Sequence, residues 1–313
     1  MSAAFDLVVA GSGIAGLTAA LTGARLGRKT LVLTGDILGG QLLSINKIDG
    51  YPGFPEGIAG YDLCPIAQEQ AAAAGAEFSA TELTRIAPAD RSWHVSAGDG
   101  ADYVARAVIV ATGAGLKQLG IPGEERLFGK GVSHCASCDA PLLRDKVAVV
   151  VGGGDSAAQE ALTLAESAAR VILLHRGAAL GAQADYRERV RGNNRIEVRY
   201  NTVAEEILGA GKVTGVRVRD QSSGAVADLE ASGVFVYIGL QPNAAVLDGR
   251  VALDPTGRIV TDAAMRTGVP GLCAAGAVRS GWPGRAVASA GEGAAAAISV
   301  DRYLKDEGSW PTG

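Results

Sequence analysis

Residues 6–36 read DLVVAGSGIAGLTAALTGARLGRKTLVLTGD, and this stretch decides the fold. It opens with four consecutive apolar residues, Leu7 to Ala10, which predict a strand buried on both faces. Glycines follow at GxGxxG spacing, apolar residues recur at the helical period over 14–26, and Lys29 to Thr34 predict a second strand. This order of strand, glycine turn, helix and strand is typical of a dinucleotide-binding fold.

The three glycines of the turn, Gly11, Gly13 and Gly16, have separate physical roles. The first permits a tight turn, the second lets the backbone approach a pyrophosphate, and the third allows the helix to pack closely on the strand. The pyrophosphate then lies at a helix N-terminus, where free N–H groups and the helix dipole attract an anion. We therefore predict that all three glycines bind a cofactor.

The same pattern recurs at residues 146–176, KVAVVVGGGDSAAQEALTLAESAARVILLHR. It predicts a strand over 147–151, a turn with Gly152, Gly154 and Ala157 at GxGxxA spacing, a helix, and a strand over 170–175. Two such units predict two dinucleotides, or one dinucleotide and a degenerate copy. Further apolar strands are predicted within 108–115, 233–243 and 268–278, and a further helix over 286–299.

The strand within 268–278 follows the second unit and resumes the chemistry of the first, which predicts a discontinuous first domain. The expected fold is α/β, with two Rossmann-like three-layer nucleotide-binding domains, the second inserted into the first. Residues 1–114 and 245–313 would form the first domain, and 115–244 the insert. A length of 313 residues suits two domains of ordinary size.

Composition excludes several classes of partner. The formal charge of −4 and the pI of about 5.5 give no basic surface for nucleic acid. No apolar run approaches the ~18 residues of a membrane span. The chain enters its first predicted strand too early to leave room for a signal peptide, so we expect a cytoplasmic protein without a membrane partner.

The stretch VSHCASCDAP at 132–141 holds two of the four cysteines, Cys135 and Cys138. Three interpretations are open: a redox pair, half of a zinc site, or small residues that pack. A structural zinc site needs four ligands, and the second pair is missing, so we predict no metal. In a cytosolic chain near βαβ patterns a CxxC favours a redox pair. The other two cysteines, Cys64 and Cys273, have apolar neighbours and are predicted in the core.

Over essentially its whole length the sequence resembles the low-molecular-weight thioredoxin reductase family. The motifs that carry the resemblance are GSGIAG (11–16), GGQL (39–42), YPGFPEGIAG (51–60), ATGA (111–114), CASCDAP (135–141) and GGGDSAAQEA (152–161). The CxxC placed just ahead of the second glycine turn is the most specific of them.

The resemblance implies a thioredoxin-disulfide reductase-like flavoenzyme, with FAD on the first domain, NADH or NADPH on the second, and a homodimer. Electrons would pass through FAD and the Cys135–Cys138 pair to a protein disulfide such as thioredoxin, or to a small-molecule disulfide. The resemblance further implies that Cys138 faces the flavin, that Cys135 attacks the partner disulfide, and that Asp139 exchanges protons with the dithiol. Since a thiolate is the nucleophile in such exchange, a nearby proton carrier suits the chemistry.

Further cofactor contacts follow from the resemblance residue by residue. Beside the glycine-turn positions named above, they are Gly40, Gln41, Thr112, Gly113, Asp155, Ser156, His175, Arg176, Gly276, Ala277, Arg285 and Ala286.

Departures from the family pattern lie at the FAD contacts. Ala277 stands where the family has an Asp that binds the ribityl chain, Gly50 where it has an Asn, and Gly284 where it has an Arg. One lost neutral hydrogen bond costs about 1 kcal/mol, so we expect FAD to bind, but less tightly than in the family.

The nucleotide contacts depart as well. Gly177 and Gly181 replace two arginines of the clamp that binds the 2′-phosphate in the family. The guanidinium group of arginine suits phosphate because it binds it bidentately. We therefore expect NADH to serve at least as well as NADPH. Arg187 and Arg189 are candidates to rebuild the clamp.

Two alternative functions stay open. A flavin-dependent dithiol oxidase that passes electrons to oxygen is favoured by the weakened nucleotide clamp, and the intact GGGDSA argues against it. A non-catalytic binding or regulatory protein with weakened FAD binding is favoured by Gly50, Ala277 and Gly284. The complete CxxCD argues against this second alternative.

Overall fold

The computed structural model describes residues 3–306. The chain divides into two compact units, Met1–Gly115 with Gln241–Gly313 as unit 1 and Leu116–Leu240 as unit 2. The second boundary therefore falls at 240/241, where the sequence suggested 244/245. Residues 241–244 group with unit 1 because the backbone N–H of Asn243 bonds to Gly113 and Ala244 packs in that core.

Unit 1 is built on a sheet in the order β3-β2-β1-β6-β5-β4, with β17 pairing with β6. The strands β2, β1, β6 and β17 run parallel, and the β4–β5 hairpin joins the other part of β6 antiparallel. Their bounds are β1 Ala3–Ala10, β2 Thr30–Leu33, β3 Glu77–Ser79, β4 Leu83–Ala89, β5 Ser92–Ala97, β6 Asp102–Val110 and β17 Leu272–Ala274.

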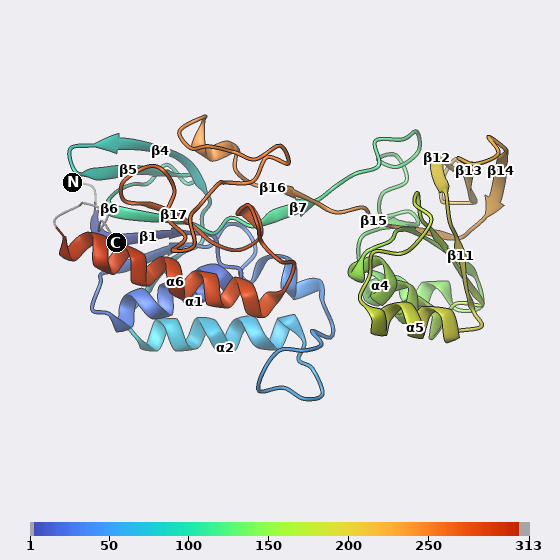
Figure 1. Ribbon diagram of the computed structural model, residues 1–313, viewed down its shortest axis with the longest axis horizontal. Coiled ribbons are helices and arrows are strands. Elements are labelled where there is room, and N and C mark those ends of the chain that lie inside the picture. The colour runs from blue at the N-terminus through green and yellow to red at the C-terminus, as the bar shows by residue number, and fades with distance from the viewer. Residues whose placement is uncertain (1–2, 307–313) are drawn as a thin grey trace. The chain divides into compact units, whose positions relative to one another are not determined.

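Alternate residues of β1 face two different cores. Leu7 and Val9 pack against the helices, whereas Phe5 and Val8 pack on the opposite face with the hairpin and the segments before β17. The helices α1, α2 and α6 lie together on one side of the sheet (Figure 1). Their bounds, with those of the short 3-10 helices, are α1 Ile14–Arg25, α2 Gly60–Ala73, α6 Ala286–Lys305, η1 Gly40–Ser44, η3 Ala245–Leu247 and η4 Gly276–Val278.

Helix α6 is longer than the predicted 286–299, because Tyr303 and Leu304 continue its buried face. It crosses α1 closely: a Cβ on Gly293 would lie 2.0 Å from the carbonyl oxygen of Ala15. This contact brings the first turns of α1 and α6 to the same edge of the sheet.

Unit 2 has a five-stranded parallel sheet in the order β11-β10-β9-β15-β8. Helices α3, α4 and α5 pack on one face, and the antiparallel sheet β12-β13-β14 packs on the other. The helices are α3 Ala136–Asp139, α4 Asp155–Ala165, α5 Ala184–Gly192 and the 3-10 helix η2 Ala140–Leu143. The strands are β8 Val132–Ser133, β9 Val147–Gly152, β10 Arg170–Leu174, β11 Ile196–Arg199, β12 Thr202–Leu208, β13 Gly215–Asp220, β14 Val226–Glu230 and β15 Gly233–Tyr237.

The chain passes between the units at two places that pair with each other. Strands β7 (Ala114–Leu116) and β16 (Leu240–Pro242) form a two-stranded sheet there. The predicted strand within 233–243 is thus divided into β15 and β16, separated at Gly239, which has a φ of +108°. Two α/β units, each of three layers, agree with the predicted fold class.

The unpaired cysteines lie in the core, as predicted. Cys64 and Cys273 are both free and buried. Trp93 is also buried on β5, whose exposure alternates along the strand. These side chains stabilise the fold by removing apolar surface from water.

Candidate active site

The glycine turn of unit 1 joins β1 to α1. Gly11 has a φ of +107°, and a Cβ there would lie 2.3 Å from the carbonyl oxygen of Ala111. A Cβ on Gly16 would lie 1.9 Å from the carbonyl oxygen of Gly11. Around Gly13, by contrast, a Cβ would meet nothing within 4 Å. Two glycines therefore allow close backbone packing, and the middle one faces open space that a ligand can enter.

The start of α1 suits an anion. Its N-cap, Gly13, provides no side-chain hydrogen bond, so the first-turn N–H groups keep their donor capacity for a ligand. A Cβ on Gly40 would lie 3.7 Å from the Cα of Gly13, which places the 39–42 segment beside this turn. The side chain of Gln41 donates a hydrogen bond to the carbonyl of Ala114. The structure thus brings two predicted FAD segments together at the start of α1.

The third predicted segment of this site is the 112–113 turn. The Oγ1 of Thr112 donates to the carbonyl of Asn243 at 2.7 Å, and the Asn243 amide donates back to the carbonyl of Thr112 at 2.9 Å. Gly113 continues the turn with a φ of +68°. These contacts fix the end of β6 where the parallel strands present their carboxyl ends.

A buried ion pair supports the Gly276 turn. The backbone N–H of Gly276 donates to Oε2 of Glu292 at 2.8 Å, and Nη2 of Arg279 donates to Oε1 of Glu292 at 2.5 Å. The two charged side chains are only 13% and 9% exposed. Nε of Arg279 is buried and lacks a hydrogen-bond partner among the described residues. Sequence reasoning missed this pair, although a lone Glu292 among small residues in AGEGAAAA was a usable signal.

The other predicted flavin contacts follow this turn. Ala277 is partly exposed beside Gly276, Arg285 is the N-cap of α6, and Ala286 is its first residue. The guanidinium of Arg285 donates to the carbonyl of Gly284 at 3.1 Å. The open space at Gly13, the uncapped α1 and the unpartnered Arg279 Nε fit a dinucleotide with further hydrogen-bond acceptors.

The second glycine turn has the same construction. Gly152 has a φ of +155°, and a Cβ there would lie 2.3 Å from the carbonyl oxygen of Tyr237. Gly154 is the N-cap of α4, and a Cβ on it would meet nothing within 4 Å. Ala157 is fully buried where α4 packs on the sheet. His175 lies against this turn, because a Cβ on Gly153 would be 2.0 Å from its Nδ1.

The remaining predicted nucleotide contacts differ in their surroundings. Ser156 and Arg176 are exposed. Both carboxylate oxygens of Asp155 accept hydrogen bonds from Gln183, at 2.7 Å from its backbone N–H and 3.0 Å from its side chain. Asp155 therefore ties the glycine turn to the residue that precedes α5, in addition to any contact with a nucleotide.

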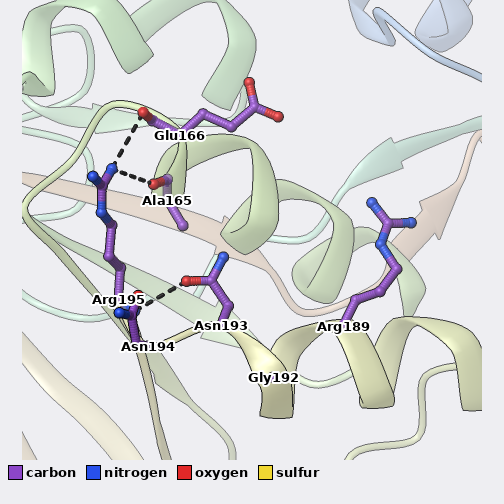
Figure 2. A pocket seen from close by; sticks show the side chains of 7 residues that line it. All are labelled: Ala165, Glu166, Arg189, Gly192, Asn193, Asn194 and Arg195. Atoms are coloured by element: carbon purple, nitrogen blue, oxygen red, sulfur yellow. Dashed lines mark hydrogen bonds between the residues drawn. The ribbon is translucent and has the colours of Figure 1, made fainter.

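Arg189, a candidate to rebuild the phosphate clamp, has other partners. It pairs with Asp185 at 3.4 Å and its guanidinium lies 5.5 Å from the ring centre of Tyr186. It also lines a surface pocket with a volume of about 720 Å³. Figure 2 shows this pocket, where Arg195 reaches the carbonyls of Ala165 and Glu166; its lining is Ala165, Glu166, Arg189, Gly192, Asn193, Asn194 and Arg195. The pocket lies at the C-terminal ends of α4 and α5, the opposite end of α4 from the glycine turn.

The redox pair is in its oxidised form: Cys135 and Cys138 are joined by a disulfide. Cys135 is the N-cap of α3, and its sulfur accepts a hydrogen bond from the backbone N–H of Cys138 at 3.2 Å. The backbone N–H of Cys135 donates to Oγ of Ser133 at 3.0 Å. Cys138 is exposed and Cys135 is partly buried. After reduction, the N–H at the Cys135 sulfur would stabilise a thiolate there.

Of the two residues that flank the pair, His134 is held by β15 and Asp139 by the redox helix itself. Nδ1 of His134 lies 3.1 Å from the carbonyl of Val236, and its ring centre lies 5.6 Å from that of Phe128. Asp139 is the last residue of α3, and its backbone N–H donates to the carbonyl of Cys135 at 3.3 Å. His134 thus has a packing role, while Asp139 stays next to the dithiol.

Two side chains beneath α3, the buried Tyr237 and the partly buried Glu160, were not foreseen from the sequence. The hydroxyl of Tyr237 accepts a hydrogen bond from the backbone N–H of Ala136 at 3.2 Å. The carboxylate of Glu160 on α4 also accepts a hydrogen bond from the backbone at Ala136, while its Oε2 is buried with no partner. Burial raises the pKa of Glu160 to about 7. Burial, and then the neighbouring Glu160, also raise the pKa of Tyr237.

A sequence signal for Glu160 did exist. It follows Ala157 by three residues and precedes Leu164 by four, so it shares the core-facing side of α4 with two fully buried residues. A carboxylate on such a face requires either a partner or a raised pKa.

Within residues 3–306 no cluster of three or more His, Cys, Asp or Glu side chains could hold a metal ion. None of the helices in that range is long and apolar enough to cross a membrane.

Two Rossmann-type turns and a disulfide on a short helix define a nucleotide-dependent disulfide oxidoreductase. The chain belongs to the pyridine nucleotide-disulphide oxidoreductase family, whose profile matches residues 5–293, and within it to the low-molecular-weight thioredoxin reductases.

Its relatives are similar over nearly their whole length. The chain is 40% identical to the thioredoxin reductase of Treponema pallidum over 304 residues, which cover 97% of this chain and 98% of that protein. It is 41% identical to the thioredoxin reductase of Mycolicibacterium smegmatis over 303 residues, or 96% and 97% of the two chains. The crystal structure of Lactococcus lactis thioredoxin reductase in its FR conformation matches with a TM-score of 0.93 at 35% identity, covering 96% of this chain and 99% of that one.

These similarities confirm the predicted family and fold class. The chain is a flavin-dependent dithiol–disulfide oxidoreductase, and its cofactors are FAD and a nicotinamide nucleotide.

Proposed function

We propose that this enzyme reduces the disulfide of a thioredoxin-like protein, with electrons that pass from NADH or NADPH through FAD to Cys135 and Cys138. The observation that carries the proposal is an accessible disulfide flanked by exposed apolar side chains. Phe128 is 58% exposed and Leu142 is 68% exposed, and they lie shortly before and after the pair in unit 2. Large exposed apolar residues favour a protein as substrate, because a small disulfide would not cover them.

The role assigned to each residue follows from the family resemblance, and the hydrogen bond at the Cys135 sulfur agrees with it. FAD, when bound, takes two electrons from the nicotinamide nucleotide and passes them to the disulfide. Reduction opens the Cys135–Cys138 bond, and the thiolate that results attacks the disulfide of the partner. Cys135 has the N–H donor that stabilises a thiolate, whereas Cys138 is more exposed. We assign the attack on the partner to Cys135, the flavin side to Cys138, and proton exchange to Asp139.

The cofactor sites follow the two glycine turns. For FAD we assign the α1 N-terminus with Gly11, Gly13 and Gly16, together with the segments at 40–41, 112–113, 276–277 and 285–286. For the nicotinamide nucleotide we assign the α4 N-terminus, from 152 to 157, with His175 and Arg176. Because the positions of two clamp arginines hold glycine, NADH is proposed to serve at least as well as NADPH.

The resemblance to the thioredoxin reductases supports three further assignments, which concern the oligomeric state, the compartment and the domains. The chain is proposed to act as a homodimer in the cytoplasm. The FAD-binding domain predicted over 1–114 and 245–313 is proposed to be unit 1, and the nucleotide-binding insert predicted over 115–244 is proposed to be unit 2, with the second boundary four residues earlier than predicted.

The test is a coupled assay under anaerobic conditions. Purified protein is given NADH or NADPH, and the reduction of added thioredoxin is followed through insulin precipitation. The Cys135→Ser and Cys138→Ser variants should each abolish this activity, whereas Cys64→Ser, which changes a buried free cysteine, should not. Oxygen consumption with a small dithiol but no reduction of thioredoxin would instead indicate a dithiol oxidase. A colourless protein that takes up no FAD would indicate a binding protein.

A further inference from the structure

A partly buried acid, Glu160, lies beneath the redox helix and has one fully buried carboxylate oxygen. Glu160 of α4 and Tyr237 of β15 both accept from the backbone N–H of Ala136, the residue that follows Cys135. Ala136 is completely buried, so the contact is shielded from solvent. Oε2 of Glu160 has no solvent exposure and no hydrogen-bond partner in the described chain. A carboxylate with an orphaned, buried oxygen is costly, and protonation removes that cost.

The first turn of α3 divides its N–H donors between two groups. The N–H of Ala136 points to Tyr237 and Glu160, and the N–H of Cys138 points to the sulfur of Cys135. An ionised Glu160 and a thiolate on Cys135 would therefore share one short turn as two negative charges. Like charges at such a site cannot both ionise cheaply, and their titrations become coupled.

The groups that surround Glu160 do not neutralise it. Tyr237 is itself an acid, and burial is the largest cause that raises its pKa. The charge of Glu160 raises it further, and that of Asp139 has a smaller effect in the same direction. The elements packed against α4 carry several charged or titratable residues: Asp139 of α3, Arg170 of β10, Glu197 and Arg199 of β11, Tyr237 of β15, and Asp185, Tyr186, Arg187, Glu188, Arg189 and Arg191 of α5. Of these, Arg170 and Arg199 both pair with Glu197, and Tyr186 donates to Gln159.

We propose that Glu160 is a positioning residue of the redox centre, which holds the first turn of α3 and must be neutral when the reduced pair carries a thiolate. Reduction of the disulfide takes two electrons and one proton, breaks the S–S bond, and leaves one thiol and one thiolate. The reduced flavin of the established activity supplies the electrons and that proton. The pair thus gains one negative charge, and an ionised Glu160 takes up a further proton from solvent in response. A pKa of about 7 lets Glu160 change charge near neutral pH.

The test measures the Cys135 thiol directly and needs neither flavin turnover nor a partner. In a Cys138→Ser background Cys135 is the remaining thiol of the pair, and the other two cysteines are buried. The rate of Cys135 alkylation by iodoacetamide is followed across the pH range of thiol ionisation, with the alkylated site identified by mass spectrometry. Glu160→Gln removes the competing charge at almost unchanged shape, so the midpoint of the profile should fall by roughly one pH unit.

The matched control is Glu166→Gln, which changes an exposed carboxylate at the far end of α4 and should leave the midpoint where it is. A folded Glu160→Gln protein with the parental midpoint would overturn the proposal. A second measurement uses the unsubstituted enzyme: infrared difference spectra on reduction near neutral pH should gain a protonated carboxyl band that moves with isotopically labelled glutamate. Absence of that band would equally overturn it.

The inference rests on the proposed role of the Cys135–Cys138 pair, yet the two can fail separately. A shifted alkylation profile in a protein that does not reduce thioredoxin would reject the proposed partner and keep the role of Glu160. Normal thioredoxin reduction with an unshifted alkylation profile would keep the proposed partner and reject the role of Glu160.

Discussion

The buried pair of Arg279 and Glu292 should be essential for the stability of unit 1. Its charged atoms lie 2.5 Å apart, with the side chains only 13% and 9% exposed. Glu292→Gln keeps the shape but leaves the Arg279 charge buried without a counter-charge. Breaking such a pair from one side costs about 3–5 kcal/mol, which is a large share of the roughly 5–15 kcal/mol that stabilises a typical domain.

The same substitution should weaken FAD binding. Oε2 of Glu292 accepts a hydrogen bond from the backbone N–H of Gly276. The next residue, Ala277, is one of the predicted flavin contacts. An amide oxygen accepts this hydrogen bond without the charge that strengthens it, so the turn should be held less firmly. The variant should therefore release FAD more readily than the parent, measured by the rise of flavin fluorescence in the filtrate.

The assay is urea unfolding of five proteins: the parent, Glu292→Gln, Glu292→Met, Arg279→Met and the double variant with both Met substitutions. Removing both charges replaces the pair with apolar groups and should cost less than the sum of the single changes, by more than about 2 kcal/mol. Arg106→Met, at a largely exposed pair with Asp6, serves as control and should cost under about 1 kcal/mol. Single changes that add up, or that cost no more than the control, would refute the assignment of a coupled buried pair.

Four further predictions concern the cofactors and the dithiol. Ala277→Asp should tighten FAD binding in a fluorescence titration, because a carboxylate regains a charge-assisted hydrogen bond, and unchanged affinity would show that another group already makes that contact. Gly177→Arg should lower the KM for NADPH relative to NADH, whereas a parent that already prefers NADPH clearly would show that the clamp is rebuilt elsewhere. Cys138→Ser should trap thioredoxin as a mixed disulfide on Cys135, and trapping by Cys135→Ser instead would reverse the two roles. Asp139→Asn should slow dithiol exchange by about 10²–10⁴-fold in stopped-flow traces with the flavin unchanged, and an undiminished rate would remove Asp139 from proton transfer.

Local patterns in the sequence were sufficient for much of the fold. The turns at Gly11 and Gly152 were predicted because a buried strand, a glycine turn and a helix are all encoded within about thirty consecutive residues. The end of α6 was misplaced, because its last buried residues, Tyr303 and Leu304, are set by packing on the core and not by a local stop signal. The division between β15 and β16 was missed for the converse reason, since one glycine interrupts an otherwise continuous apolar run.

The parts of the site that sequence reasoning missed all depend on contacts between distant segments. Glu292 meets Gly276 because α6 folds back over the end of β17, and Glu160 meets Ala136 because α4 packs under α3. Neither contact has a motif. A charged residue on an apolar helix face shows that a partner is needed, but only the tertiary structure identifies it.

The pairing of β7 with β16 has a consequence for how this chain acquires its structure. The sheet of unit 1 is complete only when β17, at Leu272–Ala274, reaches β6, which ends at Val110. Closing so long a loop of disordered chain is entropically costly and slow. If Leu116–Leu240 folds first, the pairing of β7 with β16 holds its two ends side by side. The disordered chain that must be closed between β6 and β17 is then much shorter. Folded unit 2 would then speed the folding of unit 1. Mutations that destabilise unit 2 would delay the folding of unit 1, although they change no residue of unit 1.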